Sequence, residues 1–221
     1  MDEDGGAPDR LWLADWRRRV AALYGEVRDV AAHDPADAWD RWRREREALY
    51  RGHPQSPVPA AERDAFRAHH WPYDDRLRWT VAVGEAAAPS QALGGLLGGL
   101  AIALPNSGAD TLAFDRVGRV ALPHPGGAGS LDVFWMRGYA GGLFLPFLDA
   151  TSGHETYGAG RYLLDTGKGA DLGGDPDAGT LVLDLNFAYH PSCAFDPKWA
   201  CPLAPPGNRL ATRVEAGERL R

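Results

Sequence analysis

The chain has 221 residues, of which 44% are hydrophobic and 24% are charged, as in an ordinary folded protein. Its net charge of −6 argues against a nucleic-acid partner, because binding to a phosphate backbone needs a basic surface. The acidic start lacks the apolar core of a signal peptide, and the weakly polar run 92–104 is shorter than the roughly 20 apolar residues of a membrane span. We therefore expect a cytoplasmic protein that has no membrane partner.

In chain order, residues 1–8 are predicted to be a disordered tail, and two helices follow. Asp9 is expected to cap a helix that ends near residue 30 or 31, and Asp34-Pro35 begins a second helix that stops near Gly52. The tryptophans at positions 12, 16, 39 and 42 recur at helical spacing, so these helices are expected to dock on the rest of the fold. The arginines at 41, 43, 44 and 46 are interpreted as a solvated helix face, because acidic residues alternate with them.

Residues 53–76 form a proline-rich linker and turn, with a short helix predicted over 60–67. Short apolar runs separated by Gly, Pro, Asn and Asp then predict strands at 77–83, 101–104, 111–114, 119–122, 131–136, 143–148, 161–164, 180–185 and 210–215. The glycine-rich stretch 94–99 fits a bulged strand or a loop. The predicted fold is α+β, mainly β, with N-terminal helices packed on an antiparallel β-sandwich or a partly open β-barrel. We expect a single domain over 9–221, made of a helical part (9–52), the linker (53–76) and a β-rich core (77–221) with an irregular C-terminal cover.

Polar side chains gather between residues 147 and 218, on segments that otherwise have the pattern of buried strands. Arg161 follows Asp149 and Tyr157 closely, and a guanidinium in such company can recognise a carboxylate or a phosphate. Alternatively, Arg161 pairs with an acidic neighbour in a structural network. Asp184 and Asn186 alternate on a predicted strand and so share one face, which either lines a site or faces water.

Cys193 and Cys201 allow three interpretations. They could bind zinc together with His190 or His154, one could be a nucleophilic thiol, or they could be buried and inert or bridged. The spacing is not a standard zinc pattern, so the third interpretation is favoured and no metal site is predicted.

Several motifs resemble one family in the same order. They are HPQSP (53–57), WPYD (71–74), FLDATSGHETYGAGRYL (147–163), LDLNFAYHPSCAF (183–195), CPLAPPGNRL (201–210) and EAGE (215–218). Together they are similar to the family called domain of unknown function 1684, over most of the chain from about residue 39. The family pattern has asparagine at the position of His190, which weakens the zinc interpretation. The resemblance implies a bacterial or archaeal protein and supplies no reaction, cofactor or oligomeric state.

Two hypotheses for the function follow. In the first, a polar pocket binds or acts on a small anionic molecule. Glu155 and Asp184 are its acid–base candidates, and five residues are its ligand-binding candidates: Asp149, Tyr157, Arg161, Asn186 and Asn208. In the second, the same residues form a structural network, and the tryptophan-rich helices are the partner surface of a non-catalytic interaction or scaffold module.

Overall fold

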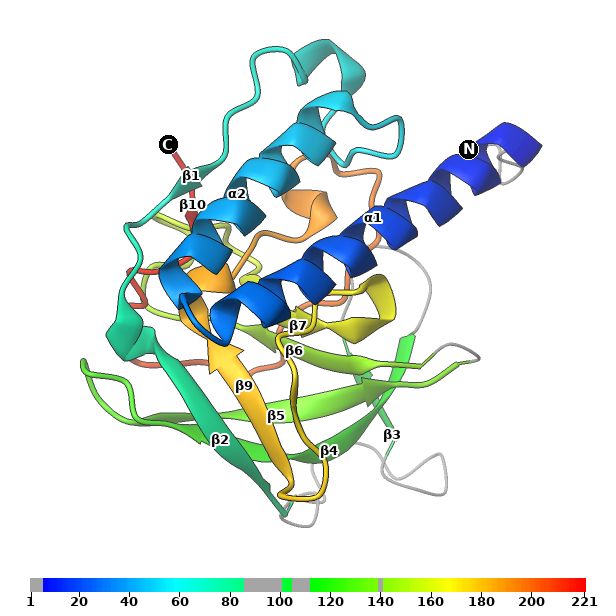
Figure 1. Cartoon of the computed structure of the whole chain (residues 1–221). Helices are drawn as coiled ribbons and strands as arrows, with labels where there is room; N and C mark the ends of the chain where they lie inside the picture. The colour runs from blue at the N-terminus through cyan, green and yellow to red at the C-terminus, as the bar shows by residue number, and fades with distance from the viewer. Residues whose placement is uncertain (1–5, 86–100, 105–111, 139–140) are drawn as a thin grey trace.

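The computed structural model describes residues 6–85, 101–104, 112–138 and 141–221 (Figure 1). Residues 1–5 of the predicted tail and the glycine-rich stretch 94–99 lie outside the described residues.

Two long helices open the chain and lie side by side on one side of the sheet (Figure 1). Helix α1 spans Ala7–Ala31 and helix α2 spans Pro35–Gly52. The predicted cap of α2 is confirmed, because the Asp34 carboxylate accepts hydrogen bonds from the backbone amides of Ala36 and Asp37. The predicted cap of α1 is wrong: Gly6 is the N-cap, and Asp9 lies in the first turn. Pro8 explains the earlier start, because its fixed φ suits the first helical turn.

The facing sides of the helices form a core with the segments that follow strands β7 (Arg161–Asp165) and β9 (Thr180–Asp184). Leu23 and Val27 of α1 and Trp42 of α2 are buried there against Phe187 and Leu172. Large apolar side chains therefore hold both helices against the sheet, as the tryptophan spacing predicted.

The linker contains less helix than predicted. Only the 3₁₀ turn Ala60–Glu62 forms within 60–67, since a segment of eight residues cannot offset the cost of helix nucleation unless it is packed. The short strand β1 (His69–His70) pairs with β10 (Glu218–Arg219), and the 3₁₀ turn Asp75–Leu77 leads into the main sheet.

Among the described residues, eight antiparallel strands form a curled half-barrel (Figure 1). Their order is β7-β6-β5-β4-β2-β9-β8, and β3 pairs with β4. The partly open barrel is therefore the correct one of the two predicted architectures. The strand bounds are β2 Arg78–Gly84, β3 Ala101–Leu104, β4 Leu112–Leu122, β5 Gly129–Met136, β6 Leu143–Phe147, β7 Arg161–Asp165, β8 Gly174–Asp175 and β9 Thr180–Asp184.

The predicted strands 111–114 and 119–122 are one strand, β4. Its pairing with β5 shifts register between Arg116 and Gly118, so a bulge continues the strand where the sequence suggested a break. Gly118 is required here, because a Cβ would lie 2.5 Å from the carbonyl oxygen of Gly84.

The strand predicted over 210–215 is wrong. The backbone amide of Leu210 donates to the carbonyl of Leu148, but that of Val214 donates to the carboxylate of Asp149 at 2.8 Å. Backbone hydrogen bonds to residues 148 and 150 reach only as far as Thr212, and the carboxylate of Asp149 takes the place of a neighbouring strand at Val214, so no continuous ladder forms. The side chains of Leu210, Val214 and Ala216 still enter the half-barrel core.

Candidate functional site: an aromatic cavity beneath the helices

Asp149 and Arg161 meet in the interior, each with about 1% of its surface exposed. Arg161 Nη2 lies 3.3 Å from Asp149 Oδ1 and donates to the carbonyl of Val214 at 3.0 Å. Arg161 Nη1 donates to the carbonyls of Ala216 and Glu218. The contacts of this guanidinium in the described residues therefore fix the C-terminal segment to the end of β6 and the start of β7.

Asp184 and Asn186 are also buried and bonded to each other. Asn186 lies in a 3₁₀ turn (Leu185–Phe187) after β9, so the prediction that both residues share a strand face is wrong. The amide of Asn186 donates to Asp184 Oδ1 at 2.7 Å and to the carbonyl of Asp74 at 2.8 Å. Burial raises the pKa of Asp184, although hydrogen bonds from Asn186 and the guanidinium of Arg78 oppose that shift.

The other three predicted site residues lie apart from one another. Asn208 is buried and bridges two strands, because its side chain pairs with the backbone of Asp132 and donates to the carbonyl of Pro146. The Glu155 side chain is 44% exposed and pairs with Arg213. The hydroxyl of Tyr157 donates to the carbonyl of Cys193 at 3.3 Å.

None of these seven residues lines the aromatic cavity beneath the helices or the polar groove on the other side of α2. Their predicted catalytic and ligand-binding roles stay predictions. The buried residues among them are held by hydrogen bonds and ion pairs inside the protein, as the structural-network alternative requires.

Cys193 and Cys201 are both buried and form no disulfide with each other. The backbone amide of Cys193 points at Cys201 Sγ at 3.3 Å. Contact with Cys193, together with burial, raises the pKa of the Cys201 thiol, which makes it a poor nucleophile. Within the described part of the chain, no group of three or more His, Cys, Asp and Glu side chains could hold a metal ion.

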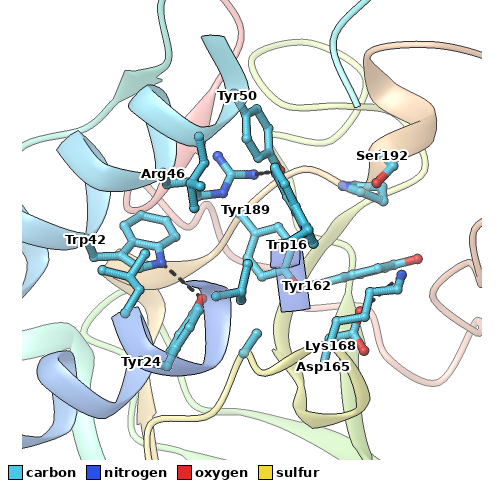
Figure 2. A pocket seen from close by; sticks show the side chains of 15 residues that line it. Trp16, Tyr24, Trp42, Arg46, Tyr50, Tyr162, Asp165, Lys168, Tyr189 and Ser192 are labelled. Carbon is cyan, nitrogen blue, oxygen red and sulfur yellow. Dashed lines mark hydrogen bonds and ion pairs between the residues drawn. The ribbon is translucent and has the colours of Figure 1, made fainter. Parts of the chain in front are cut away.

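A cavity lies where α1 and α2 cross over β7 and the segment after β9 (Figure 2). Its volume is about 80 Å³, which is room for roughly five to eight water molecules at about 10–15 Å³ each. Six aromatic side chains dominate the wall: Trp16, Tyr24, Trp42, Tyr50, Tyr162 and Tyr189. Such a wall suits a flat apolar group.

Arg46 and Asp165 are the two buried charged residues that line this cavity. The contacts of Arg46 are with the aromatic wall. Its guanidinium carbon lies 4.2 Å from the ring centre of Tyr50 and 5.0 Å from that of Tyr189. Its Nη2 donates to the hydroxyl of Tyr50 at 2.7 Å (Figure 2) and lies 3.1 Å from the carboxylate of Glu218. The buried Nη1 has no hydrogen-bond partner among the described residues. The interpretation of Arg46 as part of a solvated face is therefore wrong.

The buried carboxylate of Glu218 helps to keep Arg46 charged. Burial lowers the pKa of Arg46, but the Glu218 carboxylate and nearby tyrosine oxygens raise it, and the net shift is upward. Burial raises the pKa of Glu218, but Arg46 and two histidines lower it to about 2. One of these is His190, whose Nδ1 lies 3.9 Å from Glu218 and whose backbone amide donates to that carboxylate at 2.8 Å.

The opening of the cavity carries a second cation. Lys168 lies in the 3₁₀ turn Thr166–Lys168 after β7, is 54% exposed, and pairs with Asp165 at 3.4 Å. The charge of Asp165 raises the pKa of Lys168, so this ammonium stays charged at neutral pH. An anionic group in the cavity would thus meet the guanidinium of Arg46 and the ammonium of Lys168, beside the carboxylate of Asp165 that pairs with Lys168.

A pattern in the sequence indicates this site, although it lies outside the polar clusters of the C-terminal part. Trp42, Arg46 and Tyr50 recur every four residues and therefore share one stripe of α2. An arginine in the middle of an aromatic stripe points inward with its neighbours, whatever the charge of the adjacent sequence.

A family profile described as "Protein of unknown function (DUF1684)" matches residues 67–219. The chain belongs to this family. The solution NMR structure of an uncharacterized protein from Haloarcula marismortui is 30% identical, with a TM-score of 0.55, and the match covers 80% of this chain and 90% of that one. A search of curated proteins finds none that matches.

The family match begins at residue 67, after both helices, so the residues that α1 and α2 contribute to the cavity lie outside it. The matched part contributes Tyr162, Asp165, Lys168, Tyr189 and the residues next to them. Among the described residues, no helix combines the length and the apolar character that a membrane crossing requires.

Proposed function

We propose that the protein binds a small molecule that joins an anionic group to a flat, apolar body, and that it does so in the aromatic cavity. The observation that carries this proposal is Arg46, which is buried, charged, and has one guanidinium nitrogen without a hydrogen-bond partner among the described residues. An unpaired buried donor is costly, and an anionic ligand would satisfy it.

The aromatic wall supports the second half of the proposal. Trp16 and Tyr50 stand 5.9 Å apart between ring centres, as do Tyr162 and Tyr189, so rings line more than one side of the cavity. A planar group would gain stacking contacts and would release water from apolar surface. The cytoplasmic location expected from the sequence stays a prediction beside this proposal.

The interaction-module alternative has one supporting observation. The first turns of α1 expose Leu11 by 70%, Trp12 by 44% and Leu13 by 38%. The other helix tryptophans serve the fold itself: Trp42 is fully buried, and the indole of Trp39 donates to the carbonyl of Asn186. The proposed partner surface is therefore limited to the start of α1.

Benzoate and benzamide test the binding proposal, because they share a ring and differ in charge. We expect benzoate to bind in a 1:1 ratio by isothermal titration calorimetry and benzamide to bind at least tenfold more weakly, as a hydrogen bond to a charged group is worth about 1.5–3 kcal/mol. Equal affinity for the two compounds, or no binding of benzoate, would overturn the proposal.

Lys168→Met and Lys198→Met form a matched pair of variants. Both lysines are about half exposed and paired to an aspartate three or two residues away, but only Lys168 lines the cavity. We expect Lys168→Met to weaken benzoate binding by a factor of about 2 to 5, in the range of exposed charge pairs, and Lys198→Met to leave it unchanged. The same loss in both variants would mean that net charge alone attracts the anion.

A further inference from the structure

The opposite side of α2 forms a second, polar groove against the chain that leads into β1. Seven residues line it: Arg43, Arg44, Glu47, Ala48, Arg51, Ala68 and His70. Its volume is about 280 Å³, and it shares no lining residue with the aromatic cavity. A ligand in this groove would therefore be distinct from one that binds in the aromatic cavity.

Helical spacing brings the three arginines together. Arg44 and Arg51 lie seven residues apart, and Arg43 and Arg51 eight, so all three project from neighbouring positions on one side of α2. The far wall is fixed, because the backbone amide of Ala68 donates to the carboxylate of Glu47 at 3.0 Å. The groove is thus a defined concave surface and not only a row of charges on a helix.

The positive charge in the groove exceeds its internal compensation. Arg43 and Arg44 share the single carboxylate of Asp40. Arg51 reaches only the backbone carbonyl of Asp64, at 3.4 Å, and pairs with no carboxylate among the described residues. Since Glu47 is the one carboxylate of the lining, an anion would find donors from three guanidiniums there.

His70 adds an unused polar atom at the base of the groove. Its ring packs edge-on against Trp42 and Trp39, with ring centres 5.7 and 6.1 Å apart. Its Nε2 is buried and has no hydrogen-bond partner in the described part of the chain. In the tautomer that carries the proton on Nε2, this atom could donate to a bound anion only after the ring of His70 turned towards the groove.

We propose that this groove binds a phosphate group, either free or carried on a small organic molecule. Arginine suits this role because its planar fork of donors matches phosphate oxygens in pairs, and three arginines line this groove. The side chains of Arg43 and Arg44 are 42% and 61% exposed and Arg51 is exposed as well, so the groove is open to a ligand from solvent.

Titration calorimetry with inorganic phosphate and with glycerol 3-phosphate, at constant ionic strength, tests this proposal. Neither probe carries an aromatic group for the aromatic cavity, and the groove variants described below assign the binding to the groove. We expect saturable 1:1 binding of at least one probe. Tighter binding of glycerol 3-phosphate would assign the site to phosphorylated organic molecules, and equal or tighter binding of inorganic phosphate would assign it to the free ion. The absence of saturable binding of both probes would overturn the proposal.

A double variant and a matched control separate a built site from general attraction. Arg44→Gln with Arg51→Gln removes two charges from the groove, and Arg18→Gln with Arg19→Gln removes two from α1, where both arginines share Asp15 much as Arg43 and Arg44 share Asp40. We expect the first pair to weaken binding about tenfold or more and the second to change it less than twofold. Equal weakening would overturn the proposal in favour of non-specific attraction. All these side chains are on the surface, so circular dichroism should confirm that both variants fold.

Discussion

Arg161 was a ligand-binding candidate, but its contacts in the interior are structural. It joins the carboxylate of Asp149 to carbonyls of the C-terminal segment, and its Nε is buried without a hydrogen-bond partner among the described residues. Because removal of one member of a buried ion pair strands the other, we expect Arg161→Ala to cost about 3–5 kcal/mol. Thermal unfolding followed by circular dichroism should show a melting temperature lower by several degrees.

Arg213→Ala is the control for this experiment. Arg213 also pairs with predicted site residue Glu155, but at the surface, where solvent screens the pair, so its loss should hardly change the melting temperature. If Arg161→Ala were as stable as the wild type, Arg161 would be free to serve a ligand, as the first sequence hypothesis proposed.

The contrast between Arg161 and Arg46 explains why residue types alone do not locate a site. Both are buried arginines paired with a buried carboxylate. The paired nitrogens of Arg161 are surrounded by backbone carbonyls, whereas Arg46 lines a cavity. That difference depends on how the helices and the C-terminal segment pack, which no local sequence pattern encodes.

At the scale of elements, the start of α2 is the best-defined local signal. The Asp34 carboxylate accepts hydrogen bonds from the amides of Ala36 and Asp37 at 3.1 and 3.0 Å. We expect Asp34→Ala to reduce the free energy of unfolding by about 1 kcal/mol and Asp34→Asn to reduce it much less, since asparagine also caps helices. Urea denaturation measures both changes.

Asp37→Ala provides the comparison within the same helical turn. Asp37 is acidic and near the helix start, but its side chain pairs with Arg41 on the surface and caps nothing. We expect a smaller loss than for Asp34→Ala. An equal loss would show that the charge near the helix end, and not the cap, stabilises α2.

Helices and strands could be predicted from the sequence where a single local pattern determines them. The alternating or continuous apolar runs that became β5, β6, β7 and β9 needed no tertiary information, nor did the Asp34-Pro35 helix start. Residues 210–215 have the composition of a strand, but the amide of Val214 donates to Asp149 and its carbonyl accepts from Arg161. Residues 119–122 also have the composition of a strand, but they continue the bulged strand β4 and do not begin a new strand.

At the scale of the whole molecule, one buried ionic group joins three distant parts of the chain. Glu218 in β10 contacts Arg46 in α2 and His190 after β9. His70 in β1 is close enough to feel the charges of Glu218 and Arg46. This group links the helices, the sheet and the C-terminus, so its protonation should affect the stability of the entire fold.

Acid should therefore destabilise the protein in two steps. Burial lowers the pKa of His190 and of His70 from 6.5 to about 4, so below pH 6.5 the unfolded chain takes up protons that the folded protein does not. Glu218 has a folded pKa of about 2 against 4.5 for an ordinary glutamate, so its contribution is present above pH 4.5 and is lost as the pH falls towards 2. Both effects have the same sign, and the free energy of unfolding should fall from pH 6.5 downward.

Urea denaturation at several pH values between 7 and 4 measures this dependence. His190→Gln should make the slope of stability against pH shallower, because one of the two histidines no longer titrates. His33→Gln, in the exposed turn between α1 and α2, should keep the slope of the wild type. A slope that His190→Gln leaves unchanged would contradict the role assigned to His190.

The sequence by itself determined the helices that begin the chain, the antiparallel strands and the family. Each depends on neighbours along the chain or on motifs in a fixed order: apolar periodicity, an Asx cap before proline, and turn residues between strands. Only the tertiary structure decided which polar residues are structural and which line a cavity. Burial and hydrogen-bond satisfaction arise when α2, β7 and the C-terminal segment meet, and these contacts join residues more than a hundred positions apart, such as Arg46 and Glu218.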